Sequence, residues 1–576
     1  MIKKINIKKI MWSYLKTEKK YLIPLVISAF ILGSALFAIP YITKAFSQSA
    51  MDKDQQMIIV MIIIILVIMI SRILFRFLTS YIGRLMGIKI EVKMRRDAFK
   101  KMYKLKYEYF DTHAPGSFVS NLTNDPKTIY SVSFSIITES IFAIMGFAGG
   151  ISFAFINSWL VGISIIVIYG IGLTVTYFNA KKLQKFVMES KVLYSWMNTN
   201  VTSQATSISE IKSYNSFEFE QLRNEVLNNE FLINKKQTSL LQSTFNATSL
   251  GVALIIQMGI LIISGLELYF GSIDKASFTA FISLSTILIM PINRIASLFN
   301  QFSDGISSLK RFGRFMNLPE EKQTGSKFIS KDGVIEFKDV DFSYIINGQT
   351  KDVLKNFNLI IRKGQKIAFV GKSGVGKSTI LKLILGFYEI QKGQILVDGQ
   401  DIAKVNINEL RENISYIQQS GIIFDGTLKE NIMYKTEDIS EEKFNSLLKD
   451  SKLNKFVREN KHGSSTMLGT NGSQISGGQK QRVSIARAML ADNNIILLDE
   501  ATSALDNKTE KDIQESIDFL FKTKTTVTVA HRISTIMNSD IIYYIKESGN
   551  ISESGTYKEL MSLKGDFFNL VKTHEY

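Results

Sequence analysis

The chain has 576 residues, of which 46% are hydrophobic, and it carries 69 Lys and Arg against 52 Asp and Glu. The absence of Cys excludes a disulfide scaffold, a thiolate metal site and a cysteine nucleophile, and four His leave little room for a zinc enzyme. The net charge of +17 indicates nucleic acid or an anionic membrane surface as a partner, and the position of the charges decides between them.

The N-terminal half of the chain holds long apolar runs that charged segments separate. Tyr21 to Thr43 and Ser140 to Ala180 contain no charged residue at all. About 20 apolar residues are enough to cross the hydrocarbon core of a bilayer as a helix. The sequence therefore predicts six transmembrane helices, near residues 21–43, 57–79, 133–156, 159–180, 246–267 and 276–297.

Positive charge is concentrated on one side of these predicted spans. Lys residues precede the first span, and Lys and Arg follow the second, fourth and sixth, whereas the complementary connections hold only Lys44, Lys53 and Lys275. Because Lys and Arg favour the cytoplasmic side, we expect a multi-pass protein of the cytoplasmic membrane with both termini in the cytoplasm. The excess of Lys and Arg is then explained by membrane topology and by contact with anionic lipid, rather than by binding of nucleic acid.

The two long cytoplasmic connections, 80–132 and 181–245, repeat apolar residues at spacings of three and four, so the flanking helices are expected to continue past the membrane. After residue 320, short β-branched strands alternate with helices, which is typical of an α/β domain with a largely parallel sheet. The expected strands are 334–337, 366–370, 495–498, 526–530 and 541–545. The expected organisation is an α-helical membrane domain (1–318), a polar linker (319–332) and an α/β domain (333–576).

A glycine-rich loop follows the expected strand 366–370. Residues 371–379, GKSGVGKST, fit the pattern G-x-x-x-x-G-K-[ST] and open an apolar helix, which is the context that the pattern requires. The backbone N–H groups of such a loop surround phosphate oxygens at a helix N-terminus. Lys377 is expected to reach the terminal phosphates, and Ser378 to offer its hydroxyl to Mg²⁺. The sequence thus predicts a phosphate-binding loop formed by Gly371, Ser373, Gly374, Gly376, Lys377, Ser378 and Thr379.

Two carboxylates follow the buried apolar strand at 495–498. Asp499 is placed to hold the Mg²⁺ shell, and Glu500 is placed to polarise a water for attack on the γ-phosphate. An Asp-Glu pair at the end of a strand is often only a solvated acidic turn. The motifs that accompany it here favour the hydrolytic interpretation.

Further motifs resemble those of ABC transporters. Residues 475–479, ISGGQ, resemble the family's LSGGQ signature, and residues 499–506, DEATSALD, resemble its Walker B motif and D-loop. His531 resembles the switch histidine, Gln419 the Q-loop glutamine, and Tyr344 the aromatic residue that stacks on adenine. The segments 109–125 and 209–221 resemble the two coupling-helix regions. Six spans before one nucleotide-binding domain resemble the half-size layout of bacterial ABC exporters.

The resemblance implies that two chains dimerise and enclose two ATP molecules, each between the phosphate loop of one chain and the signature of the other. Closure of the dimer on ATP and its release on hydrolysis would drive alternating access. The implied hydrolytic residues are Glu500, His531 and Gln419. The implied nucleotide contacts beyond the loop are Tyr344, Ser476, Gly477, Gly478, Gln479 and Asp506, and the implied Mg²⁺ ligands are Ser378, Gln419 and Asp499.

The sequence departs from the family's pattern at three places. Ile475 replaces the usual Leu of the signature, and residues 468–474 lack the acidic residues that the family often carries there. Gln418 stands where many members have Pro, so Gln418 remains an alternative to Gln419. Because the hydrolytic residues are all present, a homodimer is favoured over a heterodimer with a second half-transporter.

The expected activity is ATP-driven export of an amphipathic or hydrophobic substrate, with a drug or peptide favoured. A lipid flippase and an importer built on the exporter fold are the alternatives, and the six fused spans disfavour a soluble ABC ATPase. Polar groups inside apolar spans are costly and are therefore candidates for substrate contact, although hydrogen bonds between helices also explain uncharged ones. These groups are Glu139, Gln257, Tyr169, Thr174 and Tyr177.

Overall fold

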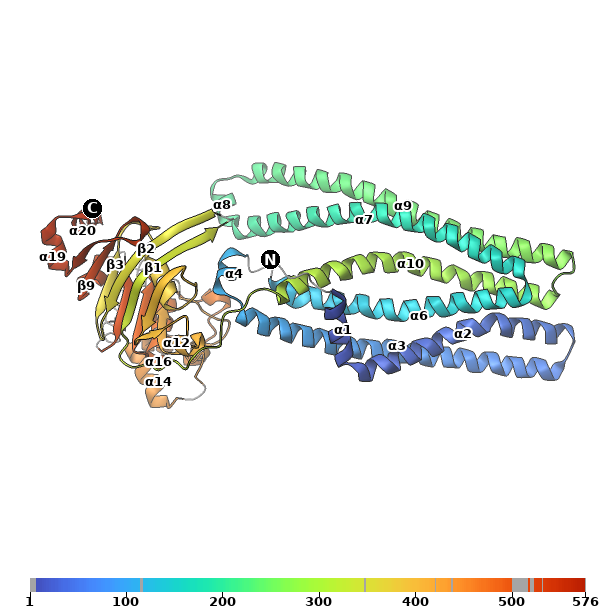
Figure 1. The fold of residues 1–576 in the computed structure, drawn as a ribbon, viewed down its shortest axis with the longest axis horizontal. Helices are drawn as coiled ribbons and strands as arrows, with labels where there is room; N and C mark the ends of the chain where they lie inside the picture. Colours follow the sequence, from blue (N-terminus) through green and yellow to red (C-terminus); the bar gives the residue numbers. More distant parts are fainter. Residues whose placement is uncertain are drawn as a thin grey trace. The chain divides into compact units, whose positions relative to one another are not determined.

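The computed structural model describes residues 7–113, 118–346, 349–419, 421–436, 439–499, 516–517, 523–530 and 532–574. These residues form two compact units (Figure 1). Unit 1 contains residues 1–103 and 114–318, and unit 2 contains residues 104–113 and 319–576. Residues 104–113 therefore belong to unit 2, although the chain on both sides of them belongs to unit 1.

Unit 1 is entirely helical among its described residues (Figure 1). Its helices are α1 (Ile7–Thr17), α2 (Lys19–Met51), α3 (Gln55–Lys104), the short π-helix η1 (Ser120–Asn124), α6 (Asp125–Asn157), α7 (Trp159–Thr206), α8 (Ile208–Ser213), α9 (Phe217–Tyr269) and α10 (Lys275–Met316). Helix α6 packs against α2, α10 and α7, and α9 packs against α7 and α10.

Five of the described helices are long and apolar enough to cross a membrane, namely α2, α3, η1 with α6, α7 and α9. The sixth predicted span lies in α10, whose assessed apolar stretch, Lys275–Ile289, is shorter than the others. Helices α3, α7 and α9 have 50, 48 and 53 residues, more than twice the length that a bilayer requires. The helical membrane domain is confirmed, and α3, α7 and α9 are long enough to continue past a bilayer, as the sequence predicts.

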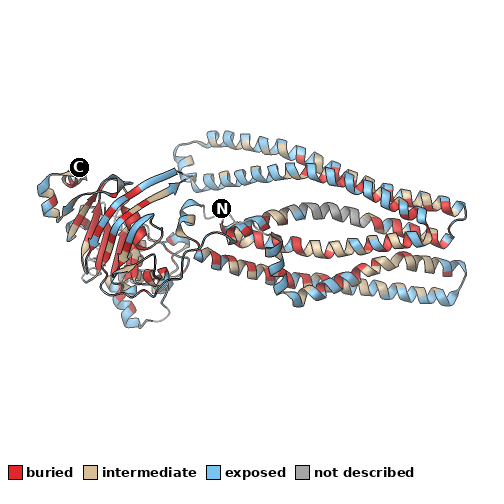
Figure 2. Ribbon diagram, viewed as in Figure 1, coloured by how far each residue is buried: buried red, intermediate tan, exposed pale blue. Residues whose placement is uncertain are grey.

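Figure 2 shows that much of α3, α7 and α9 is exposed, and many of the exposed residues on these helices are large and apolar. No residue in the most apolar window of α3 is buried, although that window has a mean hydropathy of 3.2. Exposed apolar surface of this extent is typical of proteins that contact lipid or another chain. The multi-pass membrane character of unit 1 therefore follows from its surface as well as from its sequence.

Close helix contacts in unit 1 require small residues. Helix α3 meets α6 at Gly87, where a Cβ atom would lie 1.8 Å from the Cζ atom of the Tyr130 ring. The Tyr130 hydroxyl donates a hydrogen bond to the carbonyl of Gly83, one turn earlier on α3. Two of the polar groups singled out in the spans are satisfied by backbone: Tyr169 donates to the carbonyl of Leu288 on α10, and Thr174 donates to its own helix.

Unit 2 contains two sheets and the helix α4 (Tyr107–Thr112). The strands are β1 (Ile335–Ile346), β2 (Gln349–Ile361), β3 (Lys366–Val370), β4 (Lys392–Val397), β5 (Gln400–Asp401), β6 (Ile414–Ile417), β7 (Ile495–Asp499), β8 (Thr525–Val529), β9 (Ile541–Ile545) and β10 (Ile551–Gly555). The helices after α4 are α11 (Lys377–Ile384), α12 (Ile407–Glu412), α13 (Leu428–Ile432), α14 (Glu441–Asp450), α15 (Asn454–Glu459), α16 (Gly477–Ala491), α18 (Ile533–Met537), α19 (Tyr557–Leu563) and α20 (Asp566–His574). Short 3-10 turns are η2 (Gly463–Ser465), η3 (Thr470–Gly472) and η4 (Glu547–Gly549).

The larger sheet has the order β10-β9-β3-β8-β7-β6, and all its pairs are parallel except β10 with β9. The smaller sheet, β2-β1-β4-β5, is antiparallel. The central strands are buried on both faces, as parallel strands in α/β proteins are, and Figure 2 shows them in red. The predicted parallel sheet is confirmed, whereas the long β1–β2 hairpin was not predicted.

A buried ion pair joins two helices of unit 1. Arg311 on α10 donates to both carboxylate oxygens of Asp125 at the start of α6, at 2.5 Å and 3.2 Å. The side chain of Asp125 is 1% exposed, whereas that of Arg311 is half-exposed. A second pair on α10, between Asp304 and Lys191 of α7, has both partners about half-exposed.

We predict that Arg311→Met destabilises the protein much more than Lys191→Met. Loss of Arg311 leaves a buried carboxylate without its partner, which costs about 3 kcal/mol, whereas an exposed pair contributes about 1 kcal/mol or less. Thermal unfolding of the two variants in the same detergent measures the difference. Equal unfolding temperatures for both variants would contradict a structural role for the buried pair.

Candidate ATP site

The phosphate-binding loop predicted from the sequence connects β3 to α11. Gly371 and Gly376 have φ angles of +146° and +105°, which disfavour residues with a side chain. A Cβ atom at Gly371 would lie 2.3 Å from the carbonyl oxygen of Ile545, and one at Gly376 would lie 2.4 Å from Val353. Glycine is therefore required at both ends of the loop. Backbone N–H groups that a helix N-terminus gathers in this way form an anion site.

Lys377 and Ser378 are the first two residues of α11. The Lys377 side chain is buried, and its Nζ atom donates to the carbonyls of Gly371 and Lys372 at 2.8 Å and 2.9 Å. The ammonium group is thus held against the loop itself. Ser373 and Gly374 are exposed at the outer turn of the loop. The loop therefore combines a fixed positive charge with an accessible backbone.

Asp499 ends β7 and connects to the loop through Ser378. The Ser378 hydroxyl donates to Oδ1 of Asp499 at 2.7 Å, so a hydroxyl and a carboxylate oxygen lie side by side. Oxygen ligands of this kind are those that Mg²⁺ prefers. The described residues contain no cluster of three or more His, Asp or Glu side chains with metal-site geometry. Ser378 and Asp499 therefore fit a Mg²⁺ ion that takes further ligands from phosphate and water.

The second oxygen of Asp499 accepts a hydrogen bond from the Tyr416 hydroxyl at 3.2 Å. Tyr416 lies on β6, next to β7, where it pairs with Leu497. Burial and the adjacent Asp499 carboxylate raise the pKa of Tyr416 well above its usual range, so its hydroxyl remains a donor at neutral pH. Sequence analysis missed this residue, because an aromatic residue in a buried strand resembles an ordinary packing residue.

Tyr344 lies on β1 and contacts the same helix as the loop. Its hydroxyl and that of Thr379 on α11 are 3.1 Å apart. Its ring packs edge-on against Phe342 and Tyr388, with centroids 4.9 Å and 5.1 Å away. These contacts fix the ring beside the first turn of α11. The position is compatible with the predicted stacking on adenine.

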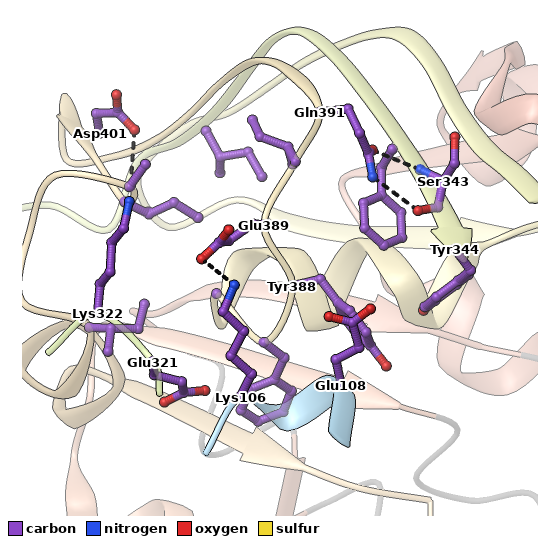
Figure 3. A pocket seen from close by; sticks show the side chains of 18 of the residues that line it. Lys106, Glu108, Glu321, Lys322, Ser343, Tyr344, Tyr388, Glu389, Gln391 and Asp401 are labelled. Carbon is purple, nitrogen blue, oxygen red and sulfur yellow. Dashed lines mark hydrogen bonds and ion pairs between the residues drawn. The ribbon is translucent and has the colours of Figure 1, made fainter. Parts of the chain in front are cut away.

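A cavity of about 440 Å³ lies beside Tyr344 (Figure 3). Gln391 exchanges two hydrogen bonds with the backbone of Ser343, and Lys106 pairs with Glu389 at 2.9 Å. The figure shows these residues around the cavity, with Tyr344 next to Ser343. The cavity belongs to unit 2, because residues 104–113 do.

Helix α4 overlaps the start of the first predicted coupling region, 109–125, and contacts the end of α11. The ring of Tyr107 stacks on Phe387 with centroids 4.2 Å apart. Asp111 accepts hydrogen bonds from the Tyr388 hydroxyl and from Lys382 of α11, the latter at 3.4 Å. The helix that begins with Lys377 and Ser378 thus contacts α4 at its other end.

The predicted signature begins α16. Ser476 and Gln479 form a reciprocal cap in which the Gln479 side chain accepts from the Ser476 N–H at 2.9 Å, and the Ser476 hydroxyl accepts from the Gln479 N–H at 3.3 Å. Ser476 and Gly477 are exposed, Gly478 is buried, and a Cβ atom at Gly477 would meet open space. The motif therefore presents an accessible helix N-terminus.

The two alternative Q-loop residues follow β6 directly. Gln418 is half-buried and lines a cavity with Tyr416 and Arg487, whereas Gln419 is exposed. The choice between the two glutamines therefore stays open. Glu500, Asp506 and His531 lie outside the described residues.

Comparison with known proteins gives a consistent result. Residues 354–503 match the family described as "ABC transporter", and residues 22–292 match the "ABC transporter transmembrane region". The chain is 31% identical over 564 residues to the "Uncharacterized ABC transporter ATP-binding protein YwjA" of Bacillus subtilis, with 97% of both chains covered. It is 32% identical over 516 residues to the "ATP-dependent lipid A-core flippase" of Francisella tularensis, which covers 86% of this chain and 82% of the relative.

The fold also matches a solved structure, that of a bacterial Atm1-family ABC exporter with ATP bound. The TM-score is 0.85 at 20% identity, over 97% of this chain and 98% of the other. Both family regions lie in this one chain, with the transmembrane region before the ABC transporter region. This is the order that the sequence motifs predict. The chain therefore belongs to the ABC transporter family and is a half-size ABC exporter, an ATPase coupled to transport.

Proposed function

We propose that two copies of this chain hydrolyse ATP to move an amphipathic, lipid-like substrate outward across the cytoplasmic membrane. One observation carries the ATPase part of the proposal. The phosphate loop and the Ser378–Asp499 pair meet at one edge of the parallel sheet, in a chain that also contains the membrane helices. Binding and hydrolysis of ATP are therefore assigned to that edge.

Each predicted site residue has a distinct role in the proposal. The loop N–H groups and Lys377 bind the β- and γ-phosphates, and Tyr344 stacks on the adenine. Ser378 and Asp499, with Gln419 or the alternative Gln418, would hold Mg²⁺, which when bound neutralises charge on the phosphates. Glu500 accepts a proton from the attacking water, and His531 binds the γ-phosphate.

A second copy of the chain completes the site. The capped N-terminus of α16 is exposed at Ser476 and Gly477, and a helix N-terminus attracts anions. We propose that this terminus contacts the γ-phosphate bound by the partner subunit. A homodimer needs no further gene product, because one chain carries both the phosphate loop and the signature.

The orientation in the membrane follows from charge. The Lys and Arg residues flank the ends of the spans that lead into the long connections, and such residues favour the cytoplasmic side. We therefore place unit 2 in the cytoplasm, where ATP is available. Export then moves the substrate away from the ATPase.

The substrate class is inferred from the relatives. Several of them are named lipid A-core flippases, at 31–32% identity over more than 500 residues in Francisella. The exposed apolar faces of α3, α7 and α9 provide a lipid-contacting surface. A lipid-like amphiphile is therefore favoured here, whereas a drug or peptide was favoured from the sequence. A drug or peptide remains the second candidate, since the same apolar surface suits any amphiphile.

We predict that Lys377→Met weakens ATP binding, because it removes the buried ammonium group that lies against the loop. The expected loss is at least tenfold, or about 1.4 kcal/mol, as for a charge-assisted contact. Lys372→Met is the matched control, since Lys372 is exposed and only its backbone carbonyl contacts Lys377. Titration with a fluorescent nucleotide measures the affinity of both variants for nucleotide. Equal affinities of the two variants would contradict the role of Lys377.

We predict that Glu500→Gln abolishes ATP turnover and retains ATP binding. The amide keeps the size of the side chain but cannot accept the proton of the attacking water. Steady-state phosphate release and nucleotide titration separate the two effects. Near-normal phosphate release from this variant would show that another group is the general base.

The substrate class is tested by comparing cells that express the wild type with cells that express Glu500→Gln. We expect an amphipathic lipid to be enriched in the outer leaflet or the medium only with the wild type. Untargeted mass spectrometry of medium and of surface-labelled lipids detects it. A peptide or drug-like metabolite enriched in the medium instead would favour the second candidate, and depletion from the medium would indicate import.

A further inference from the structure

The carboxylate of Asp499 is held from two sides by residues of different elements. Ser378 of α11 donates to Oδ1 at 2.7 Å, and Tyr416 of β6 donates to Oδ2 at 3.2 Å. Rotation of the carboxylate about its Cβ–Cγ bond would break both hydrogen bonds. The two donors together therefore define the plane of the carboxylate.

The Tyr416 hydroxyl is itself fixed in place. Strand β6 pairs with β7 in parallel register from Ile414 to Ile417, so the backbone of Tyr416 cannot shift along its neighbour. The ring is half-buried and lies edge-on to Phe387, with centroids 6.5 Å apart. The paired strand and the packed ring thus hold the Tyr416 hydroxyl beside the carboxylate of Asp499.

We propose that Tyr416 is a positioning residue that sets the Mg²⁺ affinity of the ATP site through Asp499. The proposal rests on the assignment of Ser378 and Asp499 to the metal site in the proposed function. Outer hydrogen-bond partners that orient a metal ligand raise the affinity for the metal, because the ligand does not lose rotational freedom on binding. In this role Tyr416 acts through its hydrogen bond to Asp499, by orienting the carboxylate.

A purely structural role for the same tyrosine makes a different prediction. If Tyr416 only fills space between β6 and Phe387, removal of its hydroxyl leaves the ring contacts and the metal affinity unchanged. If it orients Asp499, removal of the hydroxyl lowers metal affinity while metal-free nucleotide binding stays the same. The variant Tyr416→Phe separates the two roles, because it keeps the ring and loses only the oxygen.

The test uses the full-length protein in detergent, with ADP bound and Mn²⁺ as the probe ion. We expect Tyr416→Phe to raise the Mn²⁺ dissociation constant, followed by electron paramagnetic resonance, about tenfold. The Mg²⁺ concentration for half-maximal ATPase activity should rise by a similar factor, and high Mg²⁺ should restore activity. ADP affinity in EDTA and the thermal unfolding temperature should remain those of the wild type.

Tyr543→Phe is the matched control, since Tyr543 is a half-buried ring of the same sheet that packs on Phe369. It should leave Mn²⁺ affinity unchanged. In an Asp499→Asn background, Tyr416→Phe should add nothing, because the oriented carboxylate is already lost.

Two outcomes would overturn the inference. Wild-type Mn²⁺ affinity in Tyr416→Phe would leave the residue with a packing role only. An additive loss in the Asp499→Asn background would show that Tyr416 acts by another route. Unchanged Mn²⁺ affinity in Asp499→Asn alone would instead contradict the metal site of the proposed function, so the two failures are distinguishable.

Discussion

The site depends on one constraint, the parallel register of β3, β8, β7 and β6. Because these strands run in the same direction, their carboxyl ends meet at one edge of the sheet. β3 delivers the phosphate loop there, β7 delivers Asp499, and β6 delivers Tyr416 and the glutamines that follow it. The adjacent end of β9 supplies the Ile545 carbonyl against which Gly371 packs, which leaves no room for a side chain. A change of register in any of these strands would separate groups that must act together.

Sequence reasoning identified the features that a contiguous stretch of residues encodes. Strand β3 and the loop after it form a contiguous motif, and the membrane helices are long apolar runs, so neither needs knowledge of distant contacts. Tyr416 could not be found in this way, because its partner Asp499 is 83 residues away and only the sheet brings them together. The attachment of 104–113 to unit 2 was missed for the same reason, because the partners of Tyr107 and Asp111 lie on α11 or just after it, more than 250 residues later. The β1–β2 hairpin was missed because the exposed first part of β2 is polar and lacks the apolar pattern that predicts a strand.

The connection between ATP chemistry and the membrane domain can be followed along the chain. Lys377 and Ser378 begin α11, and Lys382 of the same helix donates to Asp111 of α4. Helix α4 follows the long helix α3 after two residues, so the segment that contacts α11 is covalently continuous with a membrane helix. Close contacts such as that between Gly87 and Tyr130 leave little space for α3 to adjust locally.

We propose that ATP hydrolysis at this sheet edge moves a lipid-like amphiphile outward. The most direct measurement uses purified protein in liposomes with unit 2 facing the outside and a fluorescent phospholipid in the outer leaflet. The account predicts that MgATP moves the probe to the inner leaflet with the wild type and not with Glu500→Gln, as reported by dithionite quenching. ATP hydrolysis without any redistribution of the probe, or redistribution at the same rate in both proteins, would contradict the account.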